Sequence, residues 1–275
     1  MTEPPFPFLS TLPLATSAVA NLSKIQLFSD TAQQLIFTQG HFSIERYQQT
    51  DFYHLMLDFP QSIKKAVVKR QAEYLAGRYL SRLAMRQSGL FDSEPPQLRT
   101  GLLRAPDWPE VVTGSLTHHQ SKACAVVLTQ PLSTENLIGV DTELWLTKQQ
   151  ASEVAESIHN SKELQILLHA GFTSTEATTL LFSAKEALFK AICPFIGEYF
   201  GFKAAELKAC SWLAEKDTVN HRIGWFHLEL LTNWVAAKAP QKNYCCWFSC
   251  NEFDVLTLIS SDAVNTRWLR DTNKA

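Results

Sequence analysis

Two short apolar runs on either side of a polar turn constrain the fold of this chain more than any other feature. Residues 123–128 (ACAVVL) suit a buried strand, and residues 137–144 (LIGVDTEL) suit a second one. Residues 130–136 (QPLSTEN) between them are rich in turn-forming side chains. We therefore predict that two halves of the chain meet within residues 130–136.

Helical and strand patterns occur in both halves without regular alternation. The predicted helices are residues 62–87, which end near Gly89, and residues 147–159, 161–170 and 174–192, the last ended by Pro194. The predicted strands of the tail are residues 227–231, 245–250 and 255–259. Because repeating strand–helix–strand units are missing from this order, the pattern predicts an α+β fold.

The predicted domain organisation has three parts. Residues 1–60 form an N-terminal arm and the start of the first half, residues 61–133 the core of the N-terminal subdomain, and residues 134–275 the C-terminal subdomain. Prolines interrupt the first 24 residues, which also lack a basic leader. They are typical of an extended arm on the surface and not of a signal peptide or a membrane span.

Composition excludes several classes of function. The 275 residues carry 25 Lys and Arg against 27 Asp and Glu, a net charge of −2 that gives no overall attraction to nucleic acid or to an anionic membrane. The six cysteines form no CxxC pair, which speaks against a zinc site and for a reducing compartment. We expect a cytoplasmic monomer that binds any anionic ligand through a local cluster of cations.

Asp141 and Glu143 are the first candidate site residues. Side chains two positions apart in a strand point to the same face, so both carboxylates project together where the apolar run ends. Two adjacent carboxylates repel, and either a shared proton or a bound cation relieves the repulsion; their hard oxygen ligands suit Mg²⁺. A solvated strand end with two acidic residues is the alternative.

Glu186 and Lys190 are the second candidate pair. They are four residues apart in a predicted helix and therefore share one face of it. Such pairs are common on protein surfaces, where they have little effect on stability. The helix around this pair is unusually apolar, which favours a position at the edge of a cleft.

Cations and a histidine pair form the third group of candidates. Arg70 and Arg78 lie on the predicted helix 62–87, and Arg104 follows in a loop. The eight residues from Arg70 to Arg78 span roughly 12 Å, enough for two phosphates of one ligand, although a solvated basic face is the alternative. His118 and His119 would face opposite ways in a strand, so they make a poor zinc pair, and one of them could contact a phosphate.

Common catalytic motifs do not occur in the chain. It has no P-loop, no GxGxxG, no GxSxG and no HExxH. The frequent nucleotide-binding, hydrolase and metalloprotease interpretations therefore lose support.

The order of the motifs resembles that of the 4′-phosphopantetheinyl transferases of the Sfp superfamily. The matching segments are Arg70-x₂-Glu73-x₃-Gly77-Arg78, Arg104-Ala-Pro106-x-Trp108-Pro109, Gly114-Ser-Leu-Thr-His118, Gly139-Val-Asp141-Thr-Glu143 and Phe182-Ser-Ala-Lys185-Glu186-x₃-Lys190. The second and third segments are closer to the subgroup that serves enterobactin synthase. The resemblance covers residues 61–203.

The resemblance implies a fold, a reaction and a site. The fold would be a pseudo-twofold pair of similar α+β subdomains with the active site between them. The reaction would move 4′-phosphopantetheine from coenzyme A to a serine of an apo acyl or peptidyl carrier protein. Asp141, Glu143 and Glu186 would hold Mg²⁺, and Glu186 would be the candidate base. Lys190 would neutralise charge on the pyrophosphate. Coenzyme A would contact Arg70, Arg78, Arg104, Pro106, Thr117 and His118.

Two other functions remain open from the sequence. A Mg²⁺-dependent phosphohydrolase acting on a nucleotide would share the acidic residues and need no protein acceptor. A non-catalytic module that binds coenzyme A or a carrier would keep the fold and lose the reaction. The pathway of the carrier, whether siderophore, polyketide or fatty acid, is not visible in the sequence.

Overall fold

The chain divides into two compact units, Met1–Leu132 and Ser133–Ala275. The computed structural model describes residues 4–14, 18–32, 34–213 and 221–260. Each unit combines helices with an antiparallel sheet, so the predicted α+β fold is confirmed. The pseudo-twofold relation between the halves stays a prediction.

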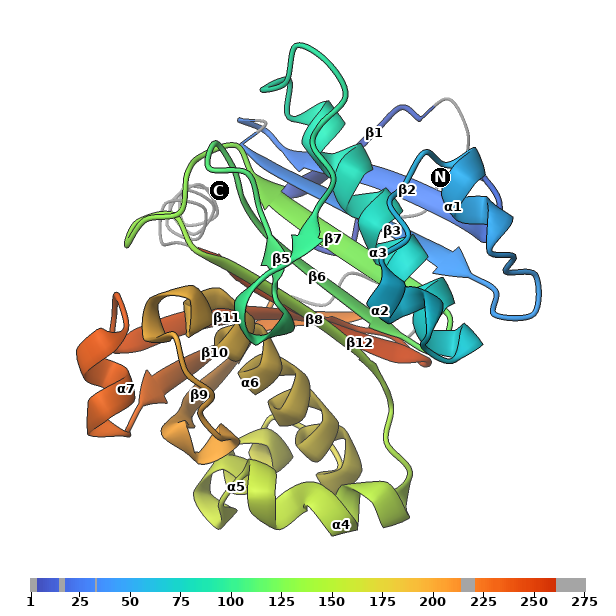
Figure 1. Cartoon of the computed structure of the whole chain (residues 1–275). Coiled ribbons are helices and arrows are strands. Elements are labelled where there is room, and N and C mark those ends of the chain that lie inside the picture. Colours follow the sequence, from blue (N-terminus) through green and yellow to red (C-terminus); the bar gives the residue numbers. More distant parts are fainter. Residues whose placement is uncertain (1–3, 15–17, 33, 214–220, 261–275) are drawn as a thin grey trace. The chain divides into compact units, whose positions relative to one another are not determined.

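The first unit is built on a five-stranded antiparallel sheet in the order β1-β2-β3-β7-β6 (Figure 1). Its strands are β1 (Leu9–Leu12), β2 (Leu22–Asp30), β3 (Leu35–Phe42), β6 (Thr113–His119) and β7 (Lys122–Leu128). The long helix α3 (Val68–Gln87) packs on β3 and β7. The smaller elements are α1 (Thr50–His54), α2 (Gln61–Lys64), η1 (Leu102–Arg104) and the short pair β4 (Arg99–Thr100) and β5 (Pro106–Asp107).

The predicted surface arm is wrong for the described part of the N-terminal segment. Strands β1 and β2 belong to the sheet, and β1 pairs with β2 along its whole length. Phe6, Leu9 and Leu22 are buried. These side chains add apolar area to the core, which outweighs the tendency of the neighbouring prolines to interrupt regular structure.

The predicted helix over residues 62–87 is two helices, α2 and α3. The chain is extended at Val67, between them. The Gln71 side chain donates hydrogen bonds to the carbonyls of Lys64 and Ala66, 3.1 and 2.8 Å away. Tyr47 donates in turn to the Gln71 side-chain oxygen at 2.8 Å. The backbone carbonyls at the break therefore accept hydrogen bonds from a side chain in place of helical backbone amides.

The second unit has a five-stranded antiparallel sheet in the order β8-β12-β11-β10-β9. Its strands are β8 (Ile138–Leu144), β9 (Ala205–Trp212), β10 (Arg222–Leu230), β11 (Asn243–Cys250) and β12 (Asp254–Ser260). Its helices are α4 (Lys148–Ile158), α5 (Ser161–His169), α6 (Ser174–Ile196), η2 (Phe202–Ala204) and α7 (Asn233–Lys238). The predicted helices and strands of this half are confirmed within a few residues of their ends.

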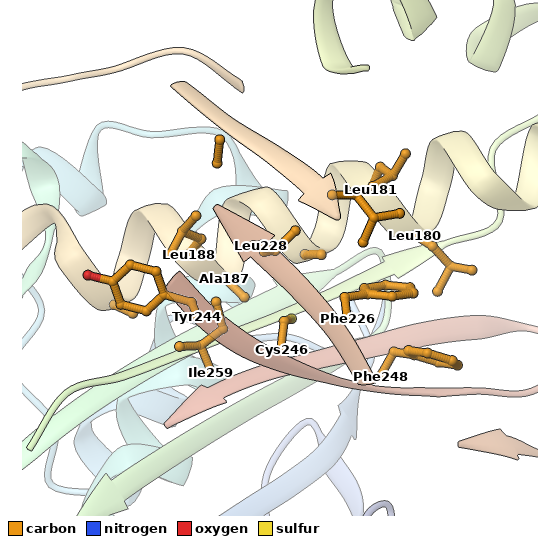
Figure 2. Close-up of a cluster of buried hydrophobic side chains, with 14 of the residues drawn as sticks. Leu180, Leu181, Ala187, Leu188, Phe226, Leu228, Tyr244, Cys246, Phe248 and Ile259 are labelled. Carbon is orange, nitrogen blue, oxygen red and sulfur yellow. The ribbon is translucent and has the colours of Figure 1, made fainter. Parts of the chain in front are cut away.

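Helix α6 covers one face of this sheet and supplies much of the core. Figure 2 shows Leu180 and Leu188 of α6 facing Phe226, Cys246 and Phe248 of the strands. The rings of Phe226 and Phe248 stack with their centroids 4.5 Å apart. This apolar contact fixes the helix against the sheet that carries the acidic residues.

Helix α6 does not end at Pro194, as predicted, but continues to Ile196. It ends at Gly197, whose φ of 72° is left-handed. Pro194 removes one backbone hydrogen bond near the end of α6 without ending the helix, and glycine adopts the left-handed conformation without strain. Among the described residues, no helix is both long enough and apolar enough to cross a membrane.

Candidate active site

Strand β8 presents Gly139, Asp141 and Glu143 on the face that α6 covers. The three residues occupy every second position of the strand, so their side-chain directions share one face. Thr257 lies opposite Asp141 in the antiparallel register, and its hydroxyl is 2.8 Å from the Ser183 hydroxyl of α6. The predicted common face of Asp141 and Glu143 thus lies beneath α6.

Gly139 allows α6 to approach β8 backbone to backbone. A Cβ atom built on Gly139 would lie 2.0 Å from the carbonyl oxygen of Ala187 and 2.7 Å from the amide nitrogen of Ala191. Any side chain here would push the helix away. The glycine of the GVDTE segment therefore brings the Ala187 and Ala191 face of α6 against β8, next to Asp141 and Glu143.

Lys190 uses this approach to reach Asp141. Its ammonium nitrogen is 2.6 Å from Asp141 Oδ1 and 3.1 Å from the carbonyl oxygen of Val140. Asp141 is 3% exposed, so this is a charge-assisted contact largely removed from water. The sequence placed Lys190 beside Glu186 on one helical face, whereas the short contact of its ammonium is with Asp141.

Burial and neighbouring charges raise the pKa values of two of these carboxylates, Glu143 and Glu186. Burial and the neighbouring charge of Asp141 raise the pKa of Glu143 to about 8, against the opposing charge of Lys190. Burial also raises the pKa of Glu186; Lys190 opposes this shift, and Asp141 adds to it. The cluster therefore disfavours three simultaneous negative charges without a further cation.

The donor set fits a hard divalent cation by its chemistry. Asp141, Glu143 and Glu186 offer carboxylate oxygens, the ligands that Mg²⁺ prefers. Within the described residues, however, no three His, Cys, Asp or Glu side chains are grouped closely enough to hold a metal ion. The magnesium site stays a prediction.

The first unit gathers a separate polar cluster at the start of α3. Arg70 donates a hydrogen bond to His118 Nε2 at 3.2 Å. The Glu73 carboxylate lies 3.8 Å from both Arg70 Nη1 and His118 Nδ1. The structure thus brings Arg70 and His118 together, as neighbours of Glu73, and leaves Arg70 46% exposed.

Arg78 and Thr117 are buried. Arg78 lies over the Tyr74 ring at 4.5 Å and donates to the carbonyl of Arg99 at 3.3 Å. Burial lowers the pKa of Arg78. Thr117 alternates with the more exposed His118 along β6, as expected for a strand.

Arg104 and Pro106 lie at the β4–β5 hairpin. Arg104 is exposed, and its φ of 63° is left-handed. Trp108 follows and packs against β6, because a Cβ atom on Gly114 would lie 2.6 Å from its ring. The glycine of the GSLTH segment is thus required by the tryptophan of the upstream segment.

A pocket beside Glu186 was missed by the sequence interpretation. It has a volume of about 160 Å³ and is lined by Lys185, Glu186, Leu188, Phe189, Tyr199, Phe200, Gly201, Phe202 and Ala205. The rings of Phe189 and Tyr199 are parallel, with centroids 5.6 Å apart, and the Phe200 ring lies 5.0 Å from that of Phe189. The cluster of aromatic residues that follows Lys190 was the available signal.

Comparison with known proteins gives the family. Residues 59–128 match the family model of the 4′-phosphopantetheinyl transferase N-terminal domain, and residues 137–246 match that of the 4′-phosphopantetheinyl transferase superfamily. Enterobactin synthase component D of Salmonella typhimurium is 32% identical over 75% of this chain and 79% of its own length. The same component of Escherichia coli O157:H7 is 39% identical over 50% of this chain and 62% of its own length. The 4′-phosphopantetheinyl transferase Npt of Nocardia iowensis is 30% identical over 64% of this chain and 79% of its own length. The chain therefore belongs to the 4′-phosphopantetheinyl transferase superfamily.

Proposed function

We propose that this protein transfers 4′-phosphopantetheine from coenzyme A to a serine of an apo acyl or peptidyl carrier protein in a Mg²⁺-dependent reaction. The observation that carries the proposal is the contact of Lys190 with Asp141, on a strand face that also bears Glu143 and beneath the helix that bears Glu186. Phosphoryl transfer needs this combination of positioned anions and cations more than it needs a covalent intermediate.

The proposed reaction is a displacement at phosphorus. The serine oxygen attacks the phosphorus that bears the pantetheine, the bond from that phosphorus to the bridging oxygen breaks, and adenosine 3′,5′-bisphosphate leaves. Glu186 accepts the serine proton, directly or through a water molecule. Its raised pKa makes it a better proton acceptor than an exposed carboxylate.

Charge neutralisation at the pyrophosphate has two proposed sources. Lys190 contributes its ammonium group, which the contact with Asp141 holds at the site. Magnesium bound by Asp141, Glu143 and Glu186 would supply the larger share of positive charge.

We propose a set of contacts for coenzyme A. Arg70 and His118 suit a phosphate, because the Arg70 guanidinium and the His118 ring lie together with part of their surface exposed; the nearby Glu73 carboxylate balances part of their charge. Arg104, Arg78, Thr117 and Pro106 are proposed as further contacts. The aromatic pocket beside Glu186 suits an uncharged part of the donor, because rings line it and a carboxylate stands at its edge.

The names of the relatives support the proposed acceptor class. Several are named as component D of enterobactin synthase, which supports a carrier protein of a siderophore synthase as the first acceptor to test. We propose such a carrier for this protein, with fatty-acid and polyketide carriers as the comparison.

Mass spectrometry of carrier proteins tests the proposal. The protein is incubated with coenzyme A, Mg²⁺ and a panel of apo carriers, each with a variant that lacks the acceptor serine. A mass gain equal to phosphopantetheine on the serine-containing carrier supports the transfer. No gain on any carrier would refute it, and metal-dependent cleavage of coenzyme A without a carrier would favour a phosphohydrolase.

A further inference from the structure

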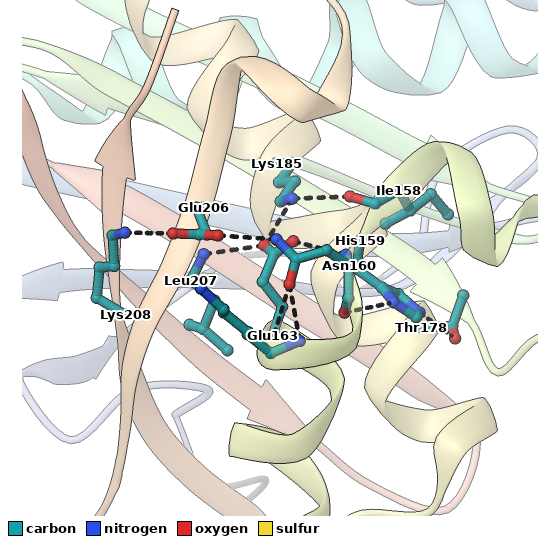
Figure 3. Close-up of polar contacts among 10 residues, drawn as sticks. Ile158, His159, Asn160, Glu163, Thr178, Lys185, Glu206, Leu207 and Lys208 are labelled. Carbon is teal, nitrogen blue, oxygen red and sulfur yellow. Dashed lines mark hydrogen bonds and ion pairs between the residues drawn. The ribbon is translucent and has the colours of Figure 1, made fainter.

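Lys185, the neighbour of Glu186 in sequence, points into the second unit and not to solvent. It is 3% exposed. Its ammonium nitrogen lies 2.7 Å from Glu163 Oε1 and donates to the carbonyl of Ile158, also at 2.7 Å (Figure 3). Lys185 therefore ties α6 to α5 and to the last residue of α4.

The Glu163 carboxylate connects three elements. Besides the ion pair with Lys185, its Oε1 accepts from the amide of Leu207 on β9 at 2.9 Å. Its Oε2 accepts from the amide of Asn160 at 3.0 Å, where it completes the N-terminal cap of α5. All the polar atoms of this pair that Figure 3 draws have a partner inside the protein.

A buried ion pair of this kind is a poor way to gain stability. Removing two charges from water costs roughly what their attraction returns, and apolar side chains of similar volume stabilise as well or better. Geometric constraint is what the pair adds. Lys185 is held by Glu163 and by the carbonyl of Ile158, and Glu163 is itself held by two backbone amides. These contacts leave α6 little freedom to rotate.

The positions on α6 show what this constraint controls. Successive residues of a helix lie about 100° apart around its axis. Glu186 and Lys190 therefore lie on a face between Lys185 on one side and Ala187 with Ala191 on the other. Ala187 and Ala191 are held by the close approach to Gly139, and Lys185 is held by Glu163.

We propose that Lys185 and Glu163 are positioning residues that fix the rotation of α6 and so direct Glu186 and Lys190 toward the acidic end of β8. The proposal rests on the proposed function for its kinetic consequences. It assigns no contact with substrate to the Lys185 ammonium or the Glu163 carboxylate, which face each other, although Lys185 also lines the pocket beside Glu186.

The test is the double variant Lys185→Met with Glu163→Gln. Removal of both charges leaves no unpaired buried ion, so the fold is expected to persist. The matched control is Arg222→Met, which removes an ion pair between β10 and Glu176 in the first turn of the same helix. Glu176 precedes Glu186 by ten residues, about 15 Å along the axis. Folding is checked by circular dichroism, and assays are run well below each melting temperature.

We expect kcat of the double variant to fall about 30- to 100-fold, because a displacement of about 1 Å at a reacting group has an effect of this size. KM for coenzyme A should stay within about threefold of wild type, and the control should retain wild-type kcat. A double variant with the kcat of the control would overturn the proposal. If the double variant does not fold, Lys185→Met alone carries the test, because the Glu163 carboxylate then keeps its two backbone amide donors; the expected loss in kcat is roughly fivefold or more.

Amide hydrogen exchange gives a readout that does not depend on the reaction. Exchange across residues 183–192 should rise in the double variant and not in Arg222→Met. Unchanged exchange would contradict the anchoring. A wild-type protein that modifies no carrier would refute the proposed function, while the exchange measurement would still decide whether the pair holds α6.

Discussion

Replacement of Gly139 by alanine tests whether the approach of α6 to β8 builds the site. The new Cβ atom would lie 2.0 Å from the carbonyl oxygen of Ala187, and ordinary contacts begin at 3.4 Å. The difference, 3.4 minus 2.0, requires a shift of about 1.4 Å along the line between these atoms. Both neighbours are backbone, so the helix and the strand must separate.

The separation has two measurable effects. Overpacking of this kind costs about 1–3 kcal/mol of the free energy of unfolding, measured by urea denaturation. It also moves Glu186 and Lys190 away from Asp141, so we expect kcat for phosphopantetheine transfer to fall roughly 100-fold.

Gly224→Ala is the matched control. A Cβ atom there would lie 2.3 Å from the carbonyl oxygen of Ser211 and 2.6 Å from the Phe248 ring. It should destabilise the same unit by a similar amount without touching the β8–α6 contact. A Gly139→Ala protein with the same kcat as Gly224→Ala would refute the idea that this helix–strand distance sets the site.

Three further variants test the charges. Glu186→Gln should abolish transfer and leave the melting temperature equal or higher at pH 7, because burial raises the pKa of Glu186 and makes its ionised form costly; full activity would remove Glu186 from the mechanism. Arg70→Ala should raise KM for coenzyme A about tenfold with little change in unfolding free energy, since nearly half of its side chain is exposed; an unchanged KM would contradict its phosphate contact. Burial lowers the pKa of His159, a shift that the backbone contact with Asn160 opposes. The unfolded chain thus binds the proton at higher pH, and wild-type stability should fall as the pH drops through about 6.5 toward the folded pKa. Urea denaturation of His159→Gln should show a smaller loss of stability over this pH range. A pH dependence identical to that of wild type would contradict the assignment of the loss to His159.

Local patterns were sufficient for the acidic residues. The alternation of a strand places Asp141 and Glu143 on one face whatever the rest of the chain does, and the structure agrees. The helical spacing of Glu186 and Lys190 is local in the same sense. These features could be predicted because they depend on residues within one turn or one pleat.

Contacts between distant segments could not be predicted in this way. The partner of the Lys190 ammonium, Asp141, is 49 residues away, and that of Lys185 is Glu163 on another helix. The break before α3 depends on Tyr47 and Gln71, which meet only in the folded chain. Phe6 and Leu9 were assigned to a surface arm because prolines obscure the strand pattern around them.

The distribution of charge also limits how an anionic donor can bind. The acidic residues Asp141, Glu143 and Glu186 all belong to the second unit, where Lys190 is already in contact with Asp141. A pyrophosphate brought to this cluster would meet carboxylates that disfavour even their own full ionisation, since the pKa of Glu143 is raised to about 8. The proposed donor is therefore compatible with these residues only if a further cation binds with it. Of the arginines proposed to contact coenzyme A, Arg78 is buried against Tyr74, whereas Arg70 and Arg104 are exposed. The charge of the cluster thus supports the proposed dependence on Mg²⁺ by an argument separate from the likeness to relatives.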